Sequence, residues 1–111
     1  MDTSAAERKV ALVEEFLSVY SQVDGGFTKW KAVMMYDVVK VRLALLDRHY
    51  NTGKIDKKMF LERLERNIQD LEYVVKCTGE EPEGSREGRV AAGARMTLSQ
   101  AKDVLLFSTF L

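Results

Sequence analysis

Apolar residues that recur at three- and four-residue steps constrain the fold of this chain more than any other feature. The clearest stripe lies in residues 56–78 and consists of Leu61, Leu64, Ile68, Leu71 and Val75. This spacing places the five side chains on one face of an α-helix. Charged residues occupy the opposite face, namely Glu62, Arg63, Glu65, Arg66 and Asp70. The segment is therefore predicted to be an amphipathic helix that buries one face and pairs its charges along the other, as in Glu62–Arg66 and Arg66–Asp70.

Residues at the two ends of this segment carry helix-boundary signals. Asp56 is expected to cap the first turn, because its side chain can accept a hydrogen bond from a backbone N–H that has no partner inside the helix. Ile55 before it is expected to pack on Phe60 as a hydrophobic staple. Gly79 stands where a glycine commonly ends a helix. These signals support a helix over residues 56–78.

Two further periodic segments precede this helix. Residues 5–23 carry an apolar stripe, and Ser4 with Glu7 at the start of the segment fits the capping box that begins many helices. Residues 28–50 are apolar nearly all round, which is typical of a central helix with neighbours on two sides. The valines of this segment also suit a strand, but the segment is over 20 residues long and contains no turn signal. A helix is therefore predicted for each.

The last periodic segment covers residues 86–107. Its stripe is built largely from small residues, Val90, Ala94, Leu98, Ala101 and Leu105. Such a face lets a helix approach its neighbour closely. Gly88 and Gly93 are expected to weaken the helix by about 1 kcal/mol each relative to Ala.

Together these segments predict an all-α fold. A chain of 111 residues suits a single helical domain, residues 1–111. The expected helices cover residues 5–23, 28–50, 56–78 and 86–107. Connections of about two to eight residues favour antiparallel neighbours. We therefore expect four long antiparallel helices arranged as two consecutive αα-hairpins, either TPR-like or a four-helix bundle.

Charge and apolar content exclude several classes of partner. The 17 basic and 17 acidic residues cancel, so no long-range field draws the protein to a nucleic acid or an anionic membrane. The longest apolar stretch, residues 33–46, is interrupted by charges and falls short of the ~20 residues that span a bilayer. One cysteine and no recognisable export signal favour a reducing compartment, so we expect a cytoplasmic or nuclear protein.

Residues that could carry chemistry are few. His49 is the only histidine, and we interpret it as a cation near a helix C-terminus, where the helix dipole favours positive charge. Cys77 is interpreted as a half-buried structural thiol, because nothing near it in sequence would activate a thiolate. Residues 84–88 resemble a phosphate-binding loop only loosely and lack the Lys-Ser/Thr of that motif. We therefore expect no catalytic residue, no metal site, no cofactor and no enzyme activity.

Aromatic and apolar residues at two places are candidates for binding another protein or peptide. Phe27, Trp30 and Tyr36 gather around the start of the second expected helix. The C-terminus is apolar and carries Phe107, Phe110 and Leu111. A four-helix domain of this size has little room to bury all of them. They either complete the core or form an exposed docking surface.

Short motifs in the second half of the chain resemble a known family. They are the turn Tyr50-Asn51-Thr52-Gly53-Lys54, the pair Leu71-Glu72, and the stretch Glu81-Pro82-Glu83-Gly84-Ser85-Arg86-Glu87-Gly88 followed by Val90-Ala91 and Ala94-Arg95. These residues resemble the C-terminal helical, tetratricopeptide-like region of SET and MYND domain proteins, particularly their arthropod relatives, over roughly residues 27–106. In that family the catalytic and zinc-binding residues lie in the SET and MYND parts, which this sequence does not contain. The resemblance therefore implies a helical module for partner or substrate binding.

Three functions remain open at this point. The leading hypothesis is a non-catalytic module that binds another protein. The second is a self-associating bundle. In this homodimer the two copies pair through the apolar stripe of residues 56–78 and through the aromatic and apolar residues described above. The third is a small regulatory bundle with a ligand pocket between its helices, which a cavity touching Trp30 or Tyr36 would favour.

Overall fold

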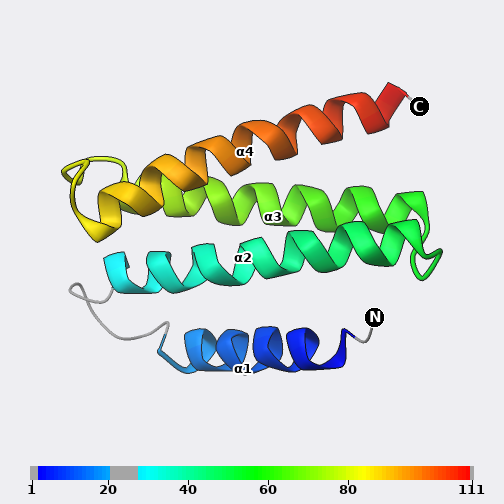
Figure 1. The fold of residues 1–111 in the computed structure, drawn as a ribbon, viewed down its shortest axis with the longest axis horizontal. Helices are drawn as coiled ribbons and strands as arrows, with labels where there is room; N and C mark the ends of the chain where they lie inside the picture. The colour runs from blue at the N-terminus through cyan, green and yellow to red at the C-terminus, as the bar shows by residue number, and fades with distance from the viewer. Residues whose placement is uncertain (1–2, 21–27, 111) are drawn as a thin grey trace.

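The computed structural model describes residues 3–20 and 28–110 of the chain. Within them the fold consists of α-helices without a strand, which confirms the all-α prediction. The helices are α1 (Ser4–Tyr20), α2 (Thr28–Asn51), α3 (Lys57–Thr78) and α4 (Arg86–Phe110). Each helix runs antiparallel to the one before it (Figure 1). α4 is three residues longer than expected, and the expected end of the first helix at residue 23 lies outside the described residues.

Local signals explain where the helices begin and end. The Asp56 side chain accepts a 2.9 Å hydrogen bond from the Met59 backbone N–H, which confirms the predicted cap of α3. Gly53 has a φ of +75° and closes the turn after α2, a conformation that glycine adopts at no steric cost. Gly79 is the C-cap of α3, as predicted, and its φ of −65° lies in the right-handed region. Its carbonyl oxygen accepts a hydrogen bond from Arg95 of α4.

The start of α1 has a hydrogen bond from a residue that was not predicted, and α4 begins with a cap that the sequence analysis did not identify. At α1 the Glu7 carboxylate accepts a 2.7 Å hydrogen bond from the hydroxyl of Thr3, one residue before the Ser4 that the sequence indicated. At α4 the Ser85 hydroxyl accepts a hydrogen bond from the Gly88 backbone N–H at 3.0 Å. Ser85 is therefore an N-cap within the segment that looked like a polar linker.

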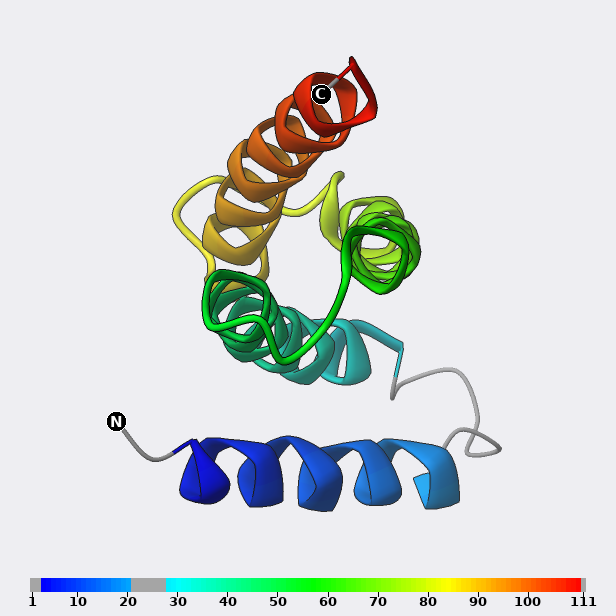
Figure 2. The same cartoon turned by 90° about the vertical axis from the view of Figure 1, so that its right-hand side faces the viewer.

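The four antiparallel helices follow one another as predicted, but they do not all pack against each other to the same extent. α3 packs extensively against both α2 and α4, whereas α2 and α4 approach each other over a short length. In the described residues the backbone of α1 lies close to α2 alone (Figure 2). Helix α2 therefore contacts neighbours on more than one side, as its apolar surface predicted. The fold is a unit of α2, α3 and α4 with α1 against the outside of α2.

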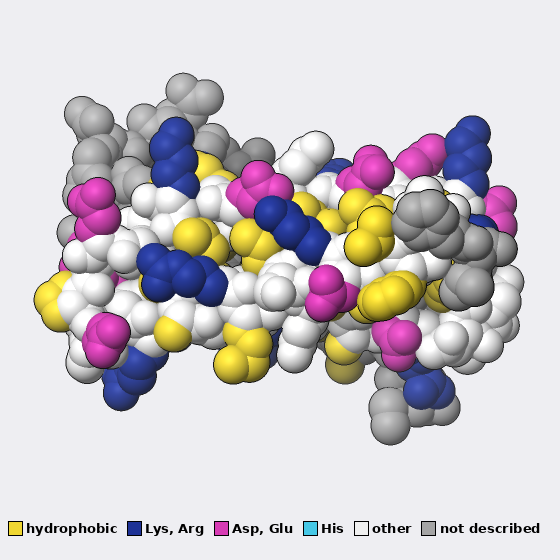
Figure 3. Space-filling view, turned by 90° about the horizontal axis from the view of Figure 1, so that it is seen from above, with side chains coloured by type: hydrophobic (Ala, Val, Ile, Leu, Met, Phe, Trp, Pro, Cys, Tyr) yellow, Lys and Arg dark blue, Asp and Glu magenta, His cyan; other side chains and the backbone are white. Residues whose placement is uncertain are grey.

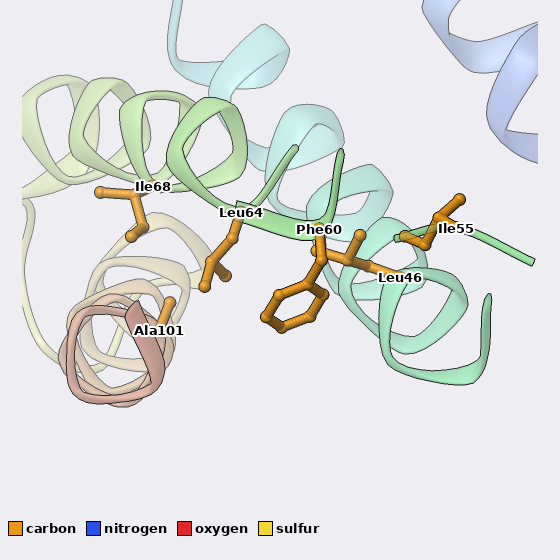
Figure 4. Packing of buried hydrophobic residues seen from close by; sticks show 6 residues of the cluster. All are labelled: Leu46, Ile55, Phe60, Leu64, Ile68 and Ala101. Carbon is orange, nitrogen blue, oxygen red and sulfur yellow. The ribbon is translucent and has the colours of Figure 1, made fainter. Parts of the chain in front are cut away.

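Two apolar clusters hold this unit together. One lies near the turn between α2 and α3 and contains Leu46, Ile55, Phe60, Leu64, Ile68 and Ala101 (Figure 4). In this cluster Ile55 and Phe60 are both buried, which agrees with the predicted staple. The other cluster joins Val39 of α2, Leu71 and Val74 of α3, and Ala94 of α4. The stripe of α3 is thus largely buried inside the chain, so it is not a free surface for a second copy.

A close contact between α2 and α4 forms at Gly93. A Cβ atom built on Gly93 would lie 3.1 Å from Cζ of Tyr36 and closer still to the tyrosine hydroxyl. The missing side chain of Gly93 therefore makes room for the ring. The sequence interpretation treated Gly93 only as a weak point of the helix.

Candidate interaction site

An apolar groove lies between α2, α3 and α4 in the half of the molecule that contains the C-terminus. It has a volume of about 190 Å³ and is lined by Leu43, Leu46, Asp47, Phe60, Leu64, Thr97, Gln100, Ala101 and Val104. Phe60 and Leu64 project from α3 into the space between the other two helices (Figure 4). Of the lining residues that the structure describes, only Asp47 is charged. The groove therefore presents an apolar floor with a single carboxylate at its wall.

The path of α4 produces this groove. α4 meets α2 near Gly93 and Tyr36, and from there its C-terminal half diverges from α2 (Figure 2). α3 lies against both helices and fills the bottom of the gap between them. Because α1 lies on the other side of α2, no described helix covers the gap.

Exposed apolar side chains border the groove on α4. Val104, which lines the groove, is 45% exposed, and Phe107 one turn later is 67% exposed. Leu106 is also exposed, and so is Met59 at the start of α3. Seen from the side of α4, the surface shows apolar side chains interrupted by charged ones (Figure 3). An exposed apolar group next to an apolar hollow is the arrangement that anchors many protein interfaces.

The structure places the aromatic residues singled out from the sequence at different locations. Trp30 is 38% exposed near the start of α2, at the end of the molecule opposite to the end of α4 where Phe107 lies (Figure 1). Tyr36 is partly buried and packs against the second apolar cluster. Phe110 is the last residue of α4, and its side chain is not described. Phe27 and Leu111 lie outside the described residues.

The groove lining itself was missed by the sequence reasoning. Val104 and Gln100 fall beside the buried stripe of α4, and only the divergence of α4 from α2 exposes them at a groove. No local pattern encodes that divergence. The one indication of the groove in the sequence was Phe107, which was predicted as a partner-binding residue. Phe107 follows Val104 by three residues, so the two side chains lie on the same side of the helix.

A charged network at Arg42 was also missed. The Arg42 guanidinium donates to Glu14 of α1 at 2.7 and 2.9 Å and to Asp70 of α3 at 2.9 Å. This side chain therefore connects three helices. The sequence reasoning paired Asp70 with Arg66 on the same helix, but the structure pairs Asp70 with Arg42. The signal available in the sequence was the position of Arg42, a charged residue within a helix that is apolar on most sides.

A second set of polar contacts holds the start of α1 near the end of α2. The Glu7 carboxylate lies 3.2 Å from Nε2 of His49 and 3.5 Å from Nζ of Lys54. The hydrogen bond from Thr3 and the positive charge of Lys54 hold the pKa of Glu7 below its usual value. His49 does lie in the last turn of α2, as expected of a cation at a helix C-terminus.

A wider hollow than the groove lies between α1 and α2. Its volume is about 640 Å³, and its lining consists of Lys9, Val10, Val13, Met34, Asp37, Val38, Lys40, Val41 and Ala44. Neither Trp30 nor Tyr36 lines this hollow. The hollow is bounded by α1 on one side, so its shape depends on how tightly that helix is held.

Groups that could support catalysis are sparse in the described part of the chain. No three His, Cys, Asp or Glu side chains there gather as a metal site. Cys77 is half-buried. Burial of Tyr73, and after it the hydrogen bond with Cys77, raises the pKa of the tyrosine. None of the described helices is long and apolar enough to cross a lipid bilayer.

Comparisons with known proteins add no relative. No family model matches the chain, and neither a curated protein nor a solved structure is similar enough to match it. The resemblance to the helical region of SET and MYND domain proteins therefore stays a prediction.

Proposed function

We propose that this protein is a non-catalytic helical module that binds another protein through the groove between α2, α3 and α4. The observation that carries the proposal is the uncovered apolar groove bordered by exposed Val104 and Phe107. Exposed apolar surface of this kind is costly unless a partner covers it. The finer assignment, a TPR-like C-terminal part of a SET-MYND-type methyltransferase, rests on the sequence resemblance alone.

The size of the groove favours a protein side chain over a small ligand. Pockets for small molecules usually measure about 300–1,000 Å³, whereas this groove holds about 190 Å³. That volume suits one or two large apolar side chains. Its walls come from α2 and α4 and its floor from α3, and an open groove of this kind accommodates a helix that turns apolar residues inward.

The charge of the groove indicates the chemistry of its partner. Among the described residues that line the groove, Asp47 is the only charged one and none is basic. A carboxylate beside an apolar floor favours a partner with a basic residue next to its apolar stripe. We therefore propose an amphipathic helix of another protein that carries Lys or Arg beside two or more large apolar residues.

Affinity capture with matched variants tests this proposal. The baits are the wild-type chain, Val104→Asp, and the control Met96→Asp. Met96 is also exposed on α4, at 65%, but does not line the groove. We expect at least one protein to be retained by the wild type and the control and to be lost by Val104→Asp. Asp47→Lys is expected to lose the same protein, because it places like charges together.

Two outcomes would contradict the proposal. One is retention of every captured protein by Val104→Asp at the wild-type level, with far-ultraviolet circular dichroism confirming that all baits are folded. The other is light scattering that shows a dimer which Val104→Asp dissociates, because the groove would then be filled by a second copy of this chain.

Binding of an apolar small molecule between α1 and α2 is a second candidate function. The volume of that hollow, about 640 Å³, falls within the usual range of ligand pockets. Six of its lining residues are apolar, Val10, Val13, Met34, Val38, Val41 and Ala44. Titration with the dye anilinonaphthalene sulfonate tests this candidate. Saturable fluorescence that Ala44→Phe abolishes would support it, and equal fluorescence from both proteins would contradict it.

A further inference from the structure

The contact between α1 and α2 differs from the other helix contacts of the fold. None of the α1 side chains that the structure describes, residues 4–15, is buried, whereas α2, α3 and α4 each contain several buried residues. Among the described helices, the backbone of α1 lies close to α2 alone (Figure 2). A hollow of about 640 Å³ remains between the two helices, although packed protein interiors leave few voids larger than a water molecule. Helix α1 therefore covers α2 without forming a close-packed core with it.

The surface of α2 under this cover is apolar. Met34, Val38 and Val41 line the hollow at steps of four and three residues, so they lie on one face of α2. Val10 and Val13 line it from α1. Val38 is buried, whereas the two α1 valines are only half-buried. Departure of α1 would therefore expose an apolar helix face of the kind that binds protein partners.

Polar contacts hold α1 in one alignment on this face. Glu14 accepts hydrogen bonds from Arg42 at 2.7 and 2.9 Å, and the Glu7 carboxylate lies 3.2 Å from Nε2 of His49. The two carboxylates are seven residues apart on α1. Their two partners are likewise seven residues apart on α2. Seven residues are about two helical turns, so both contacts fit a single antiparallel alignment.

These contacts are weak enough to break without unfolding the other helices. The side chains of Glu7 and Glu14 are 40% and 41% exposed, and ion pairs in contact with solvent contribute little to stability. Arg42 also pairs with Asp70 of α3 at 2.9 Å, so its charge keeps a partner when α1 leaves. The cost of opening therefore falls mainly on the loosely packed contact between α1 and α2.

We propose that α1 is a displaceable cover and that the face of α2 beneath it binds an amphipathic helix of another protein. The partner helix carries two carboxylates seven residues apart beside an apolar stripe, because Arg42 and His49 stand at that spacing on α2. α1 presents the same pattern within the same molecule, so it competes with the partner and lowers its apparent affinity. This inference does not rest on the groove between α2, α3 and α4, because α1 lies on the other side of α2.

Binding of a peptide to the full chain tests the proposal. The probe is a fluorescein-labelled peptide of residues 3–20, and its fluorescence anisotropy reports binding. Glu14→Lys in the protein places a like charge beside Arg42 and weakens the hold on α1. Glu15→Lys is the matched control, because it reverses an exposed charge at the next position of α1. We expect Glu14→Lys to bind the peptide at least tenfold more tightly than the wild type does, and Glu15→Lys to bind it as the wild type does.

Two further measurements separate a specific site from loose apolar attraction. A second peptide carries Glu14→Lys itself, and we expect the Glu14→Lys protein to bind it at least tenfold more weakly than the first peptide. Hydrogen exchange of the wild-type protein needs no variant. We expect the amides of α1 to exchange at least tenfold faster than those of α3, because α1 opens while α3 stays folded.

Four results would overturn the proposal. They are equal affinity of the wild type and Glu14→Lys for the first peptide, with circular dichroism showing that both proteins are folded; equal affinity of the Glu14→Lys protein for the two peptides; and exchange of α1 amides at the rate of those in α3. The fourth is light scattering that shows a wild-type dimer which Glu14→Lys dissociates, because a second copy of this chain would then occupy the face.

Discussion

Replacing Gly88 by alanine should destabilise the protein, against the expectation from helix propensity. Replacing glycine by alanine within a helix usually raises the free energy of unfolding by about 1 kcal/mol. Here, however, a Cβ atom on Gly88 would overlap the Pro82 carbonyl oxygen and lie 2.7 Å from the Pro82 carbonyl carbon. These are backbone atoms, which cannot rotate away as a side chain would. The segment before α4 must therefore shift.

The cost of that shift follows from the hydrogen bonds that it breaks. The Pro82 carbonyl oxygen accepts from the backbone N–H of Ser85 at 2.9 Å and from its hydroxyl at 2.6 Å. The same hydroxyl caps α4 through the Gly88 N–H. Each turn bond contributes about 1 kcal/mol, and so does the cap. After the gain from helix propensity, the net loss is about 2 kcal/mol in the free energy of unfolding.

Urea unfolding followed by far-ultraviolet circular dichroism measures this difference. Gly84→Ala is the matched control, because no atom lies within 4 Å of a Cβ there and Gly84 does not have a positive φ. We expect the control to be unchanged or more stable by about 0.4–1 kcal/mol. The reasoning is refuted if Gly88→Ala is as stable as the wild type or more stable.

Three further predictions concern the core, α1 and α3. Leu71→Ala should lower the free energy of unfolding by about 2–5 kcal/mol, because Leu71 is fully buried; equal urea midpoints for this variant and the exposed-site control Leu106→Ala would contradict it. Glu7 has a lowered pKa in the folded protein, so its ionised carboxylate stabilises the fold. This stabilisation is fully present above the usual carboxyl pKa of about 4.3 and is lost as the pH falls through the lower pKa of the folded protein. The stability difference between the wild type and Glu7→Gln should therefore vanish on acidification, and a difference that persists in acid denaturation curves would count against it. Cys77→Ala should bring the raised pKa of Tyr73 closer to the usual value of about 10, as measured by alkaline absorbance titration, and an unchanged titration curve would show that the thiol has no part in the shift.

The helices were predictable because their signals are local. The stripe that includes Leu64, Ile68 and Leu71 repeats with the period of a helix, and those three residues are buried in the structure. Asp56 lies next to the backbone N–H groups that it caps, so its role can also be derived from a few neighbouring residues. Ser85 had the same signal, but it falls in a segment rich in Gly, Pro and Glu that is typical of a linker.

The candidate site was not predictable in the same way. Whether Val104 and Phe107 are buried depends on the angle between α4 and α2, and that angle depends on the contact of Tyr36 with Gly93, residues far apart in the chain. The partners of Arg42 are likewise 28 residues away on either side. Periodicity shows which residues share a helix face. It does not show which neighbouring helix covers that face.

The most direct test of the protein-binding groove is site-specific photo-crosslinking from position 104. A photoreactive phenylalanine derivative replaces Val104 in one protein and Met96 in a second, and both are irradiated in a cell lysate. We predict a discrete covalent adduct with another protein from position 104, and no adduct of that mass from position 96. Identical adducts from both positions, or none from position 104, would contradict the account.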